Sequence, residues 1–371
     1  MNGLFAVYKE ENKGILKKIN DQIEAFEESG IHMDKDCIRI YSENVFAKIA
    51  YRIPFTNMLP YWKYKEEYAN YDFIYLRRPM YMNFWFIWLC RKVRKKGVKI
   101  ILEFPTYPYD KEIYLSFLSI PLIVKERIAR FFLGLSVDRI SLLTEDNNVY
   151  GVKTLHIRNG YNFKETSIRN IKEIGETIDI AIVAYFRFWH GYERLINGLC
   201  DYYKQNGKRK IHLHFVGDGT ELVNYKKLCE EKEISRHVTF YGVIEREDIL
   251  KIYDKCDIGA CTFGDYKKDN FYSCELKSRE YLAVGLPLIT GVKLDVSEYD
   301  SLSPFILEFP NNSTPIEFEK VIQFYDNLYK DKTQEKIKEM AENIHSKAEK
   351  ELNIKKAMEN VISYVQKGEP V

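Results

Sequence analysis

Apolar residues in the first half of the chain follow two alternating patterns. Short apolar runs, typical of buried strands, are "GLFAVY" (3–8), "YDFIYLR" (71–77), "VKIILEF" (98–104), "DRISLLT" (138–144) and "KTLHIRNG" (153–160). Between them, apolar residues recur at helical spacing in 12–30, 82–97 and 123–134; in the first of these segments the series Ile15, Ile19, Ile23 and Phe26 ends at Gly30. This alternation predicts parallel strands in a doubly wound sheet.

The second half repeats the same alternation of predicted strands and helices. The predicted strands are "DIAIVAYF" (179–186), "IHLHFVGDG" (211–219), "HVTFYG" (237–242), "DIGACTF" (257–263) and "PFILEF" (304–309), and the predicted helices between them are 191–207, 222–234 and 246–256. The segment "SREYLAVGLPLITG" (278–291) is predicted to form a helix followed by a strand. About the last 40 residues are predicted to be helical.

The polar, aperiodic stretch 162–177 separates the two halves. We therefore predict an α/β protein of two doubly wound, Rossmann-like domains facing each other across a cleft. They comprise 1–165 and 166–351, and a helix at about 352–371 packs back on the first. In such sheets ligands bind beyond the carboxyl ends of the strands, so the loops after strands are where chemistry is expected.

Composition excludes several classes of protein. The formal net charge of +2 argues against a general nucleic-acid binder. The seven cysteines include no CxxC pair, which predicts neither a zinc site nor a disulfide framework and favours the reducing cytosol. The N-terminal sequence does not have the long apolar core of a signal peptide, and uncharged runs such as 79–90 are too short to span a bilayer.

The strand-end loops carry a series of short motifs in a definite order. They are "RNGYN" (Asn159, Gly160 and Asn162), "FWHGYERLINGL", "FVGDG", "VTFYG" (238–242), "IYDKCDIGA" and "KSREYLAVGLPLI" (277–289). Together they resemble the GT-B glycosyltransferases of group 1, or family 4-like enzymes, over most of the chain and most strongly from about Ile157 to Ile289. The resemblance implies the GT-B fold, a nucleoside-diphosphate sugar donor with UDP or GDP as its nucleotide, retention of anomeric configuration, and no cofactor or metal. The sequence agrees, because no DxD-like acidic pair is placed to chelate magnesium.

Glu280 precedes an apolar stretch that Gly285 and Pro287 bring to an end. We expect a helix to begin near Ser273 and to hold the donor's diphosphate on its unpaired N–H groups and positive dipole end. Glu280, about one and a half turns further in, would accept hydrogen bonds from both ribose hydroxyls. The alternative is a carboxylate on a solvated helix face. The predicted donor contacts here are Glu280 and the helix start, namely Ser273, Cys274, Leu276 and Lys277.

Other loops supply further donor-binding candidates. The resemblance assigns Gly242 and Val243 to the base-binding loop, and places His190 where the family carries a lysine. The remaining candidates are the turn residues Gly217, Asp218 and Gly219, and Gly14 after the first strand. Each has a structural alternative: Asp218 orders its own turn, His190 is a core or helix-start residue, and Gly14 lies in a plain loop.

The sequence departs from the family pattern where the catalytic groups are expected. The family's first glutamate falls on Tyr272, with Glu275 nearby in another register, and its phosphate-binding arginine falls on Tyr185, with Arg187 close enough to substitute. The family's first-domain histidine has no counterpart in "ILEFPTYPYDKE", which offers the carboxylates Glu103, Asp110 and Glu112 and the rings of Tyr107 and Tyr109. We predict Asp110, Glu275 and Arg187 as catalytic candidates, with a structural role as the alternative for each.

The resemblance implies that the first domain, 1–165, binds the acceptor and the second, 166–351, the donor. Aromatic and basic stretches mark the first domain. "NFWFIWLCRKVRKKGVK" places six cations and no acid directly after an aromatic helix, and "FLSIPLIVKERIARFFLG" adds a second such stretch. They predict a cytoplasmic protein that docks peripherally on an anionic membrane surface. The alternative is that the cations serve helix dipoles and the tryptophans lie in the core.

The residues and the resemblance together predict a hexosyl- or related glycosyltransferase. The resemblance further implies a glycan or lipid-linked acceptor in cell-surface polysaccharide or glycolipid assembly. A nicotinamide-dependent dehydrogenase is excluded, because "YKEENKGIL" does not supply the GxGxxG that it requires after the first strand. A non-catalytic nucleotide-sugar-binding partner stays open, because Tyr272 and Tyr185 occupy positions that the family reserves for charge.

Overall fold

A computed structural model describes residues 1–8, 13–38, 64–110, 117, 119–164, 166–173 and 175–371. The chain divides into two compact units. Unit 1 combines Met1–Gly160 with Ile354–Val371, and unit 2 is the continuous stretch Tyr161–Asn353.

Unit 1 is built on a sheet with the strand order β2-β1-β3-β4-β5-β7-β6, parallel except for the pair β6 and β7. Its strands are β1 (Asn2–Tyr8), β2 (His32–Ile38), β3 (Phe73–Arg77), β4 (Lys99–Phe104), β5 (Arg139–Leu142), β6 (Asn148–Val149) and β7 (Val152–His156). Its helices are α1 (Lys13–Glu27), α3 (Phe84–Arg94), α4 (Ile120–Ala129), α11 (Ile354–Ala357) and α12 (Glu359–Lys367), with short 3₁₀ segments η1 (Glu66–Asn70) and η3 (Arg130–Leu135).

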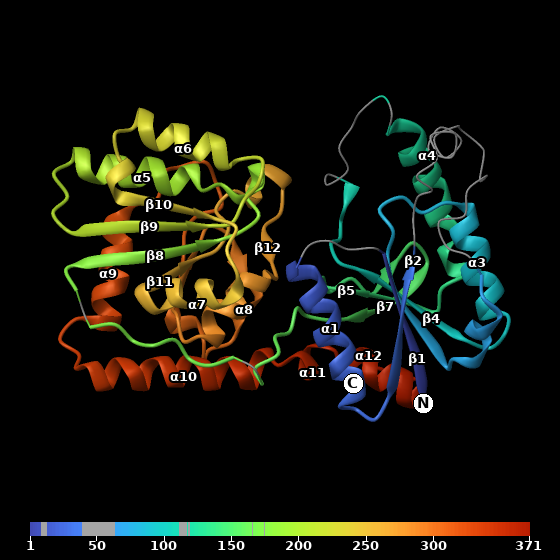
Figure 1. Ribbon diagram of the computed structural model, residues 1–371. Coiled ribbons are helices and arrows are strands. Elements are labelled where there is room, and N and C mark those ends of the chain that lie inside the picture. Colours follow the sequence, from blue (N-terminus) through green and yellow to red (C-terminus); the bar gives the residue numbers. More distant parts are fainter. Residues whose placement is uncertain (9–12, 39–63, 111–116, 118, 165, 174) are drawn as a thin grey trace. The chain divides into compact units, whose positions relative to one another are not determined.

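Alternate residues of the unit 1 strands enter two separate cores, as the period of two in a strand requires. Leu4 and Ala6 of β1 pack with α3 and α4, whereas Phe5 and Val7 pack with α1, α11 and α12. Helices therefore cover both faces of the sheet (Figure 1).

Unit 2 has a six-stranded, all-parallel sheet with the order β10-β9-β8-β11-β13-β15. The strands are β8 (Thr177–Val183), β9 (Lys210–Val216), β10 (Val238–Gly242), β11 (Ile258–Ala260), β13 (Leu288–Thr290) and β15 (Ile306–Glu308). The helices are α5 (Glu193–Lys204), α6 (Leu222–Glu231), α7 (Arg246–Lys255), α8 (Leu276–Ala283), α9 (Phe318–Tyr329) and α10 (Gln334–Leu352). In Figure 1, α5 and α6 lie on one side of the sheet and α7 and α8 on the other. The predicted doubly wound α/β architecture is confirmed in both units.

The sequence pattern missed some short or edge strands. β2 reads "HMDKDCI", and its polar residues fit a strand at the edge of the sheet, where one side meets solvent. β12 (Tyr272–Ser273) and β14 (Lys293–Leu294) form a separate two-stranded parallel sheet, too short to leave a period in the sequence.

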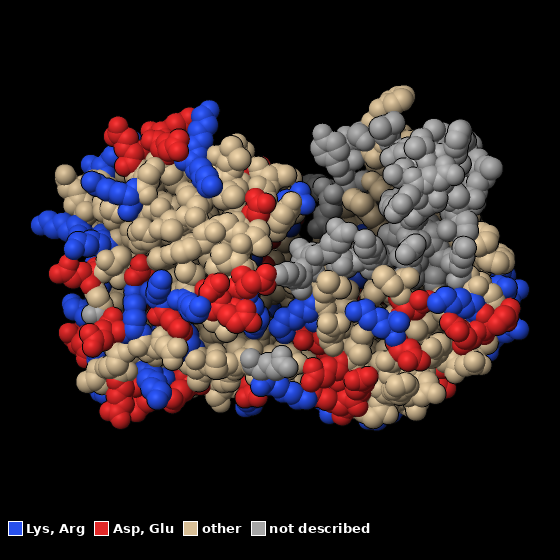
Figure 2. Space-filling view, viewed as in Figure 1, with Lys and Arg blue, Asp and Glu red and all other residues tan. Residues whose placement is uncertain are grey.

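The surface of unit 2 mixes charges of both signs on the face shown in Figure 2. All seven cysteines are free thiols. Across the parts of the chain that the structure describes, every helix is too short or too polar to cross a bilayer.

Candidate functional site

The candidate site lies in unit 2, at the point where the strand order reverses. β8 has β9 on one side and β11 on the other, so the loops that follow β8 and β11 leave the sheet side by side. The Phe263 N–H donates to the His190 carbonyl at 2.7 Å and joins these loops. Gly191, at φ +67°, leaves no room for a side chain, because a Cβ there would lie 2.4 Å from the Gly264 nitrogen.

The loop after β9 closes against the loop after β8 in the same way. A Cβ on Gly217 would lie 2.0 Å from the Ala184 carbonyl oxygen, and one on Gly219 would lie 2.4 Å from the Phe186 nitrogen. Both glycines have positive φ, and the Asp218 carboxylate accepts the Gly219 N–H at 2.7 Å. The room that we predicted for a nucleotide is thus occupied here by the chain's own backbone. Donor binding by this turn stays a prediction.

Helix α8 begins at Leu276, three residues later than we predicted. Tyr272 and Ser273 pair with β14 as a strand, and Glu275 keeps an extended backbone at φ −78°, ψ 137°. Ser273 and Cys274 therefore precede the helix, and its first N–H groups belong to Leu276 and Lys277. Glu280 lies about one turn from the start rather than one and a half.

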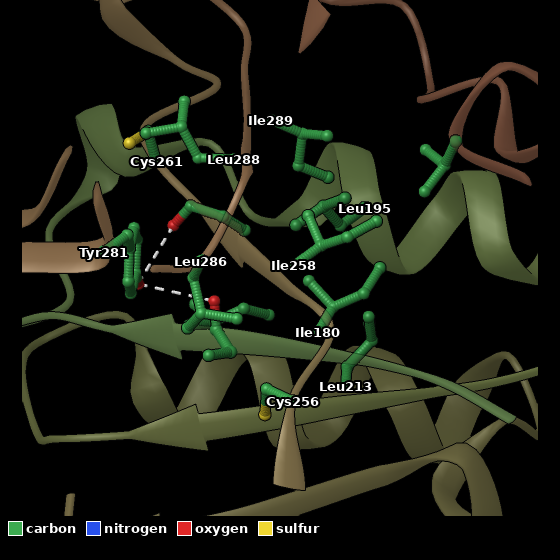
Figure 3. Close-up of a cluster of buried hydrophobic side chains, with 14 of the residues drawn as sticks. Ile180, Leu195, Leu213, Cys256, Ile258, Cys261, Tyr281, Leu286, Leu288 and Ile289 are labelled. Atoms are coloured by element: carbon green, nitrogen blue, oxygen red, sulfur yellow. Dashed lines mark hydrogen bonds between the residues drawn. The ribbon is translucent and has the colours of Figure 1, made fainter. Parts of the chain in front are cut away.

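The remaining features of α8 agree with the sequence analysis. Gly285 has φ +78° directly beyond the helix end. Tyr281 and Leu282 are fully buried, and Figure 3 shows the Tyr281 ring among Cys261, Leu286 and the strand residues of the core. Its hydroxyl accepts the Val183 N–H at 3.0 Å, which fixes the helix against the end of β8.

Lys277 points its ammonium group into the junction of the loops. Its Nζ donates to the Tyr192 hydroxyl at 3.0 Å and to Thr262 Oγ1 at 3.3 Å, and lies 3.5 Å from Glu275 Oε2. Burial, the largest single influence, opposes its charge, but Glu275 and the other neighbouring acidic groups, Asp265 among them, together outweigh burial and raise the pKa of Lys277 above its usual value. A permanent positive charge therefore sits in the first turn of α8.

Two carboxylates lie beside this lysine. The Glu275 side chain is 9% exposed, and its two oxygens find no hydrogen-bond donor among the residues that the structure describes. Asp265, which the sequence analysis did not single out, is 2% exposed and accepts from Asn270 at 2.7 Å. Burial and then the charge of Glu275 raise the pKa of Asp265. Since the loop "FGDYKKDN" matched no motif, only packing could identify Asp265.

Glu280 is bound to another charged residue. Its carboxylate accepts from Arg246, the first residue of α7, at 3.2 Å, and Arg246 also donates to the Tyr161 hydroxyl at 3.0 Å. The Glu280 side chain is 21% exposed. The predicted ribose contact is therefore held in place by an arginine that the sequence analysis had missed.

His190 ends the 3₁₀ segment η4 (Phe188–His190). Its Nδ1 accepts the Arg187 N–H at 3.2 Å, so a neutral ring carries its proton on Nε2. Burial, with Lys277, Lys268 and Arg187 nearby, lowers the pKa of His190 to about 2. His190 therefore offers a phosphate an N–H donor but no charge. The Arg187 guanidinium lies over the Tyr185 ring, 4.6 Å from its centroid.

The remaining predicted residues are distributed over both units. Gly242 ends β10 with φ +70°, and Val243 after it is exposed. In unit 1, Gly14 is the second residue of α1, so the loop that we expected there is helix instead. Asp110 lies 3.2 Å from Arg130 and 3.5 Å from Arg127.

The other acidic and aromatic candidates of unit 1 are engaged in its packing or lie outside the described residues. Glu103 is fully buried and paired with Lys18 at 2.8 Å. Burial alone would raise the pKa of Glu103, but Lys18 and Arg77 hold it below its usual value. The Tyr109 hydroxyl donates to Glu126 at 2.5 Å, and the Tyr107 ring lies 6.2 Å from Tyr150. Glu112 lies outside the described residues.

Comparison with known proteins now defines the class. Residues 163–292 match the family described as "Glycosyl transferases group 1". No curated protein sequence matches the chain. Among solved structures, a glycosyltransferase from Rickettsia africae aligns over 99% of this chain and 98% of its own, with 14% identity and a TM-score of 0.60. Sucrose-phosphate synthase from Thermosynechococcus elongatus aligns over 99% of each chain, with 13% identity and a TM-score of 0.62. Anabaena HepE, solved in complex with UDP, aligns over 99% and 100%, with 12% identity and a TM-score of 0.61.

The fold is therefore that of the GT-B glycosyltransferases. Within that class, residues 163–292 match the group 1 family, and they fall in unit 2, which carries the candidate site. The predicted resemblance is confirmed.

Proposed function

We propose that this protein transfers a sugar from a nucleoside-diphosphate sugar to a hydroxyl acceptor, with retention of configuration. The observation that carries the proposal is the first turn of α8, where free helix N–H groups and the charged Lys277 meet at the reversal point of the sheet. This combination suits a diphosphate, because the helix dipole and the ammonium group act on the same anion.

UDP is the nucleotide that we favour over GDP. Anabaena HepE has been solved with UDP and with UDP-glucose, and the pneumococcal O-GlcNAc transferase GtfA with UDP and GlcNAc. In our proposal the Glu280 carboxylate accepts hydrogen bonds from the ribose hydroxyls. These replace, or add to, the hydrogen bond that it accepts from Arg246. Val243 and Gly242 lie in the loop that we assign to the base.

The chemistry requires charge separation in the donor bond. As that bond breaks, positive charge develops on the sugar and negative charge on the departing diphosphate. Lys277 and Arg187 are proposed to stabilise the diphosphate by their positive charge. His190 is proposed to donate a hydrogen bond to it from the Nε2–H group, and Glu275 to face the sugar. A metal ion is not required in this proposal, so chelation by EDTA is expected to leave the rate unchanged.

We assign the acceptor to unit 1, and propose a glycan or lipid-linked acceptor from cytoplasmic assembly of a surface polysaccharide or glycolipid. Asp110 is the catalytic candidate on that side. Its ion pairs with Arg127 and Arg130 make a purely structural role the competing explanation.

Incubation with a panel of nucleotide sugars, with release of nucleoside diphosphate as the readout, tests the proposal. We expect release with one donor, and we expect Lys277→Met to weaken binding of that nucleotide at least tenfold, the scale of a charge-assisted contact. Lys338→Met, at an exposed position of α10, is the matched control. Nucleotide binding without turnover would favour the non-catalytic partner, and unchanged affinity in Lys277→Met would refute the site.

A further inference from the structure

Helix α4 of unit 1 turns its apolar residues outward. Ile120, Val124 and Ile128 are exposed, and Phe131, in the η3 segment that continues the helix, is 73% exposed. Their spacing places them along one face. Such a helix face usually lies against a core.

The opposite face of α4 carries polar groups and makes hydrogen bonds inside unit 1. Glu126 is fully buried and accepts from the Tyr109 hydroxyl. Arg130 donates to the Tyr150 hydroxyl at 2.9 Å and to Asp110 at 3.2 Å. Leu122, Ile123 and Ala129 are buried on the same inner face, so α4 carries apolar residues on its exposed face as well as on its buried one. A helix that faces water instead exposes mainly charged and polar residues.

Helix α3 extends the exposed apolar surface. Phe84 and Trp88 are exposed, and the Phe84 ring lies 5.5 Å from the Phe132 ring of η3. Among the described residues, ten of the seventeen large hydrophobic side chains that are exposed fall between Met80 and Leu135, so they form a patch rather than the usual scatter. We define the apolar patch as Phe84, Trp88, Ile120, Val124, Ile128 and Phe131.

Positive charge borders this patch. The last turn of α3 and the residues after it supply six cations and no acid between Arg91 and Lys99. Arg94 is paired with Asp138, and Lys99 lies over the Tyr364 ring of α12. The other four lie between Arg91 and Lys96, and Lys95 and Lys96 are exposed. Lys92 Nζ lies 5.5 Å from the centroid of the Trp88 ring, which belongs to the patch itself. The acidic residue Asp110 is paired with Arg127 of α4 and Arg130 of η3.

We propose that the apolar patch docks on the surface of an anionic phospholipid membrane. Apolar and aromatic side chains would enter the boundary between headgroups and acyl chains, while the cations of 91–96 contact the lipid phosphates. A second copy of the chain is a poorer occupant, because a symmetric interface would bring the cations of both copies together. The inference goes beyond the proposed sugar transfer and does not depend on it.

Co-sedimentation of the full chain with vesicles tests the proposal. The probes are vesicles of phosphatidylcholine alone and of phosphatidylcholine with about one third phosphatidylglycerol. We expect binding to the anionic vesicles at low salt, release at high salt as the charges are screened, and little binding to the neutral vesicles. Ile128→Ser combined with Phe131→Ser should reduce the bound fraction at least tenfold, since each removes a large exposed hydrophobe that would otherwise enter the lipid.

Two further variants make the test specific. Lys95→Glu with Lys96→Glu should weaken binding to anionic vesicles, and Val223→Ser, equally exposed on α6 of unit 2, should bind like the wild type. Equal binding by the Ile128→Ser, Phe131→Ser variant and the wild type would overturn the proposal. So would a concentration-dependent dimer, seen by sedimentation velocity, that this variant abolishes while neither protein binds vesicles. Nucleotide binding, measured on the same samples, should be unaffected, so failure of the donor site is recognised separately.

Discussion

Single glycines determine how closely the strand-end loops of unit 2 approach one another. Gly191, Gly217 and Gly219 each have positive φ and each meet backbone atoms of a neighbouring loop where a Cβ would stand. The first turn of α8 is placed by these contacts, since the loop after β8 lies between it and the turn after β9.

Gly219→Ala should lower the free energy of unfolding of unit 2 by at least about 2 kcal/mol. The new Cβ would lie 2.2 Å from the Phe186 carbonyl oxygen at φ +144°, so both a steric clash and backbone strain oppose the folded state. Urea denaturation followed by circular dichroism measures the change. Gly175→Ala is the control, because its nearest neighbouring atom is 3.8 Å away; equal stability of the two variants would contradict the packing seen here.

His190 should make stability depend on pH. The folded protein keeps the ring neutral down to a pKa of about 2, whereas the unfolded chain takes up a proton near pH 6.5. Protons therefore bind preferentially to the unfolded state, and stability falls as the pH drops below 6.5, by at most about 1.4 kcal/mol per pH unit.

The variant His190→Gln isolates this contribution. Between pH 7 and pH 5 the wild type should lose free energy of unfolding relative to the variant, as measured by urea denaturation at each pH. Parallel curves for the two proteins would show that the histidine titrates equally in both states.

At the scale of elements, helix α5 anchors the loops around the site through one buried arginine. Arg194 is 2% exposed and donates to the carbonyls of Thr314 at 2.6 Å, Phe263 at 2.7 Å and Pro310 at 3.0 Å. The sequence analysis placed this residue in a motif, "FWHGYERLINGL", without assigning it a role. The structure makes it the link between the loop after β11 and the segment before α9.

Arg194→Met should destabilise unit 2 by about 2 kcal/mol or more, because the buried Phe263 carbonyl and the partly buried carbonyls of Thr314 and Pro310 lose their donor while the apolar stem is kept. Thermal denaturation should show the loss, and Arg236→Met, at an exposed position of the 3₁₀ segment η5 (Ser235–His237), should differ little from the wild type. Nucleotide affinity is expected to fall as well, since Phe263 supports the loop that carries His190.

At the scale of the whole molecule, the C-terminal segment completes unit 1. Met358, Val361 and Val365 pack with Phe26 and Ile157 in the core beneath α1. Gly160 lies against the same segment, because a Cβ there would stand 2.4 Å from Ile354 Cα. Unit 2, in contrast, is a continuous stretch of chain.

The fragment 161–353 should therefore fold alone with a cooperative thermal transition, whereas 1–160 should not. Without 354–371 the first unit loses several fully buried side chains worth about 2 kcal/mol each, a sum comparable to the whole stability of a domain. Circular dichroism and binding of a hydrophobic dye to the two fragments measure this. A cooperative unfolding transition in 1–160 would contradict it.

Much of the fold could be predicted from the sequence. Runs such as "DIAIVAYF" and "VKIILEF" are continuous apolar segments because strands of a parallel sheet are buried on both faces, and each became a central strand. The edge strand β2 and the two-residue strands β12 and β14 were not predicted. Partial exposure, or a length of only two residues, leaves no recognisable hydrophobic periodicity in the sequence. The start of α8 was misplaced for the same reason.

The candidate site was less predictable. The motifs pointed to Lys277 and Glu280, but nothing local indicated that Asp265 is buried near Glu275, or that Arg246 reaches Glu280 from the next helix. The lowered pKa of His190 depends on burial and on Lys277 and Lys268, which lie on other segments of the chain. No sequence motif links these partners to the residues that they contact, so the contacts could not be found from the sequence.

The sequence by itself determined the alternation of strands and helices, the two sheets, and the resemblance to group 1 glycosyltransferases, because burial periodicity and short motifs are properties of neighbouring residues. The tertiary structure alone decided which loops meet and which charges share a site. The physical reason is strand order: β8 lies beside β11, a strand more than 70 residues later in the chain, and that pairing brings His190, Phe263 and the start of α8 together.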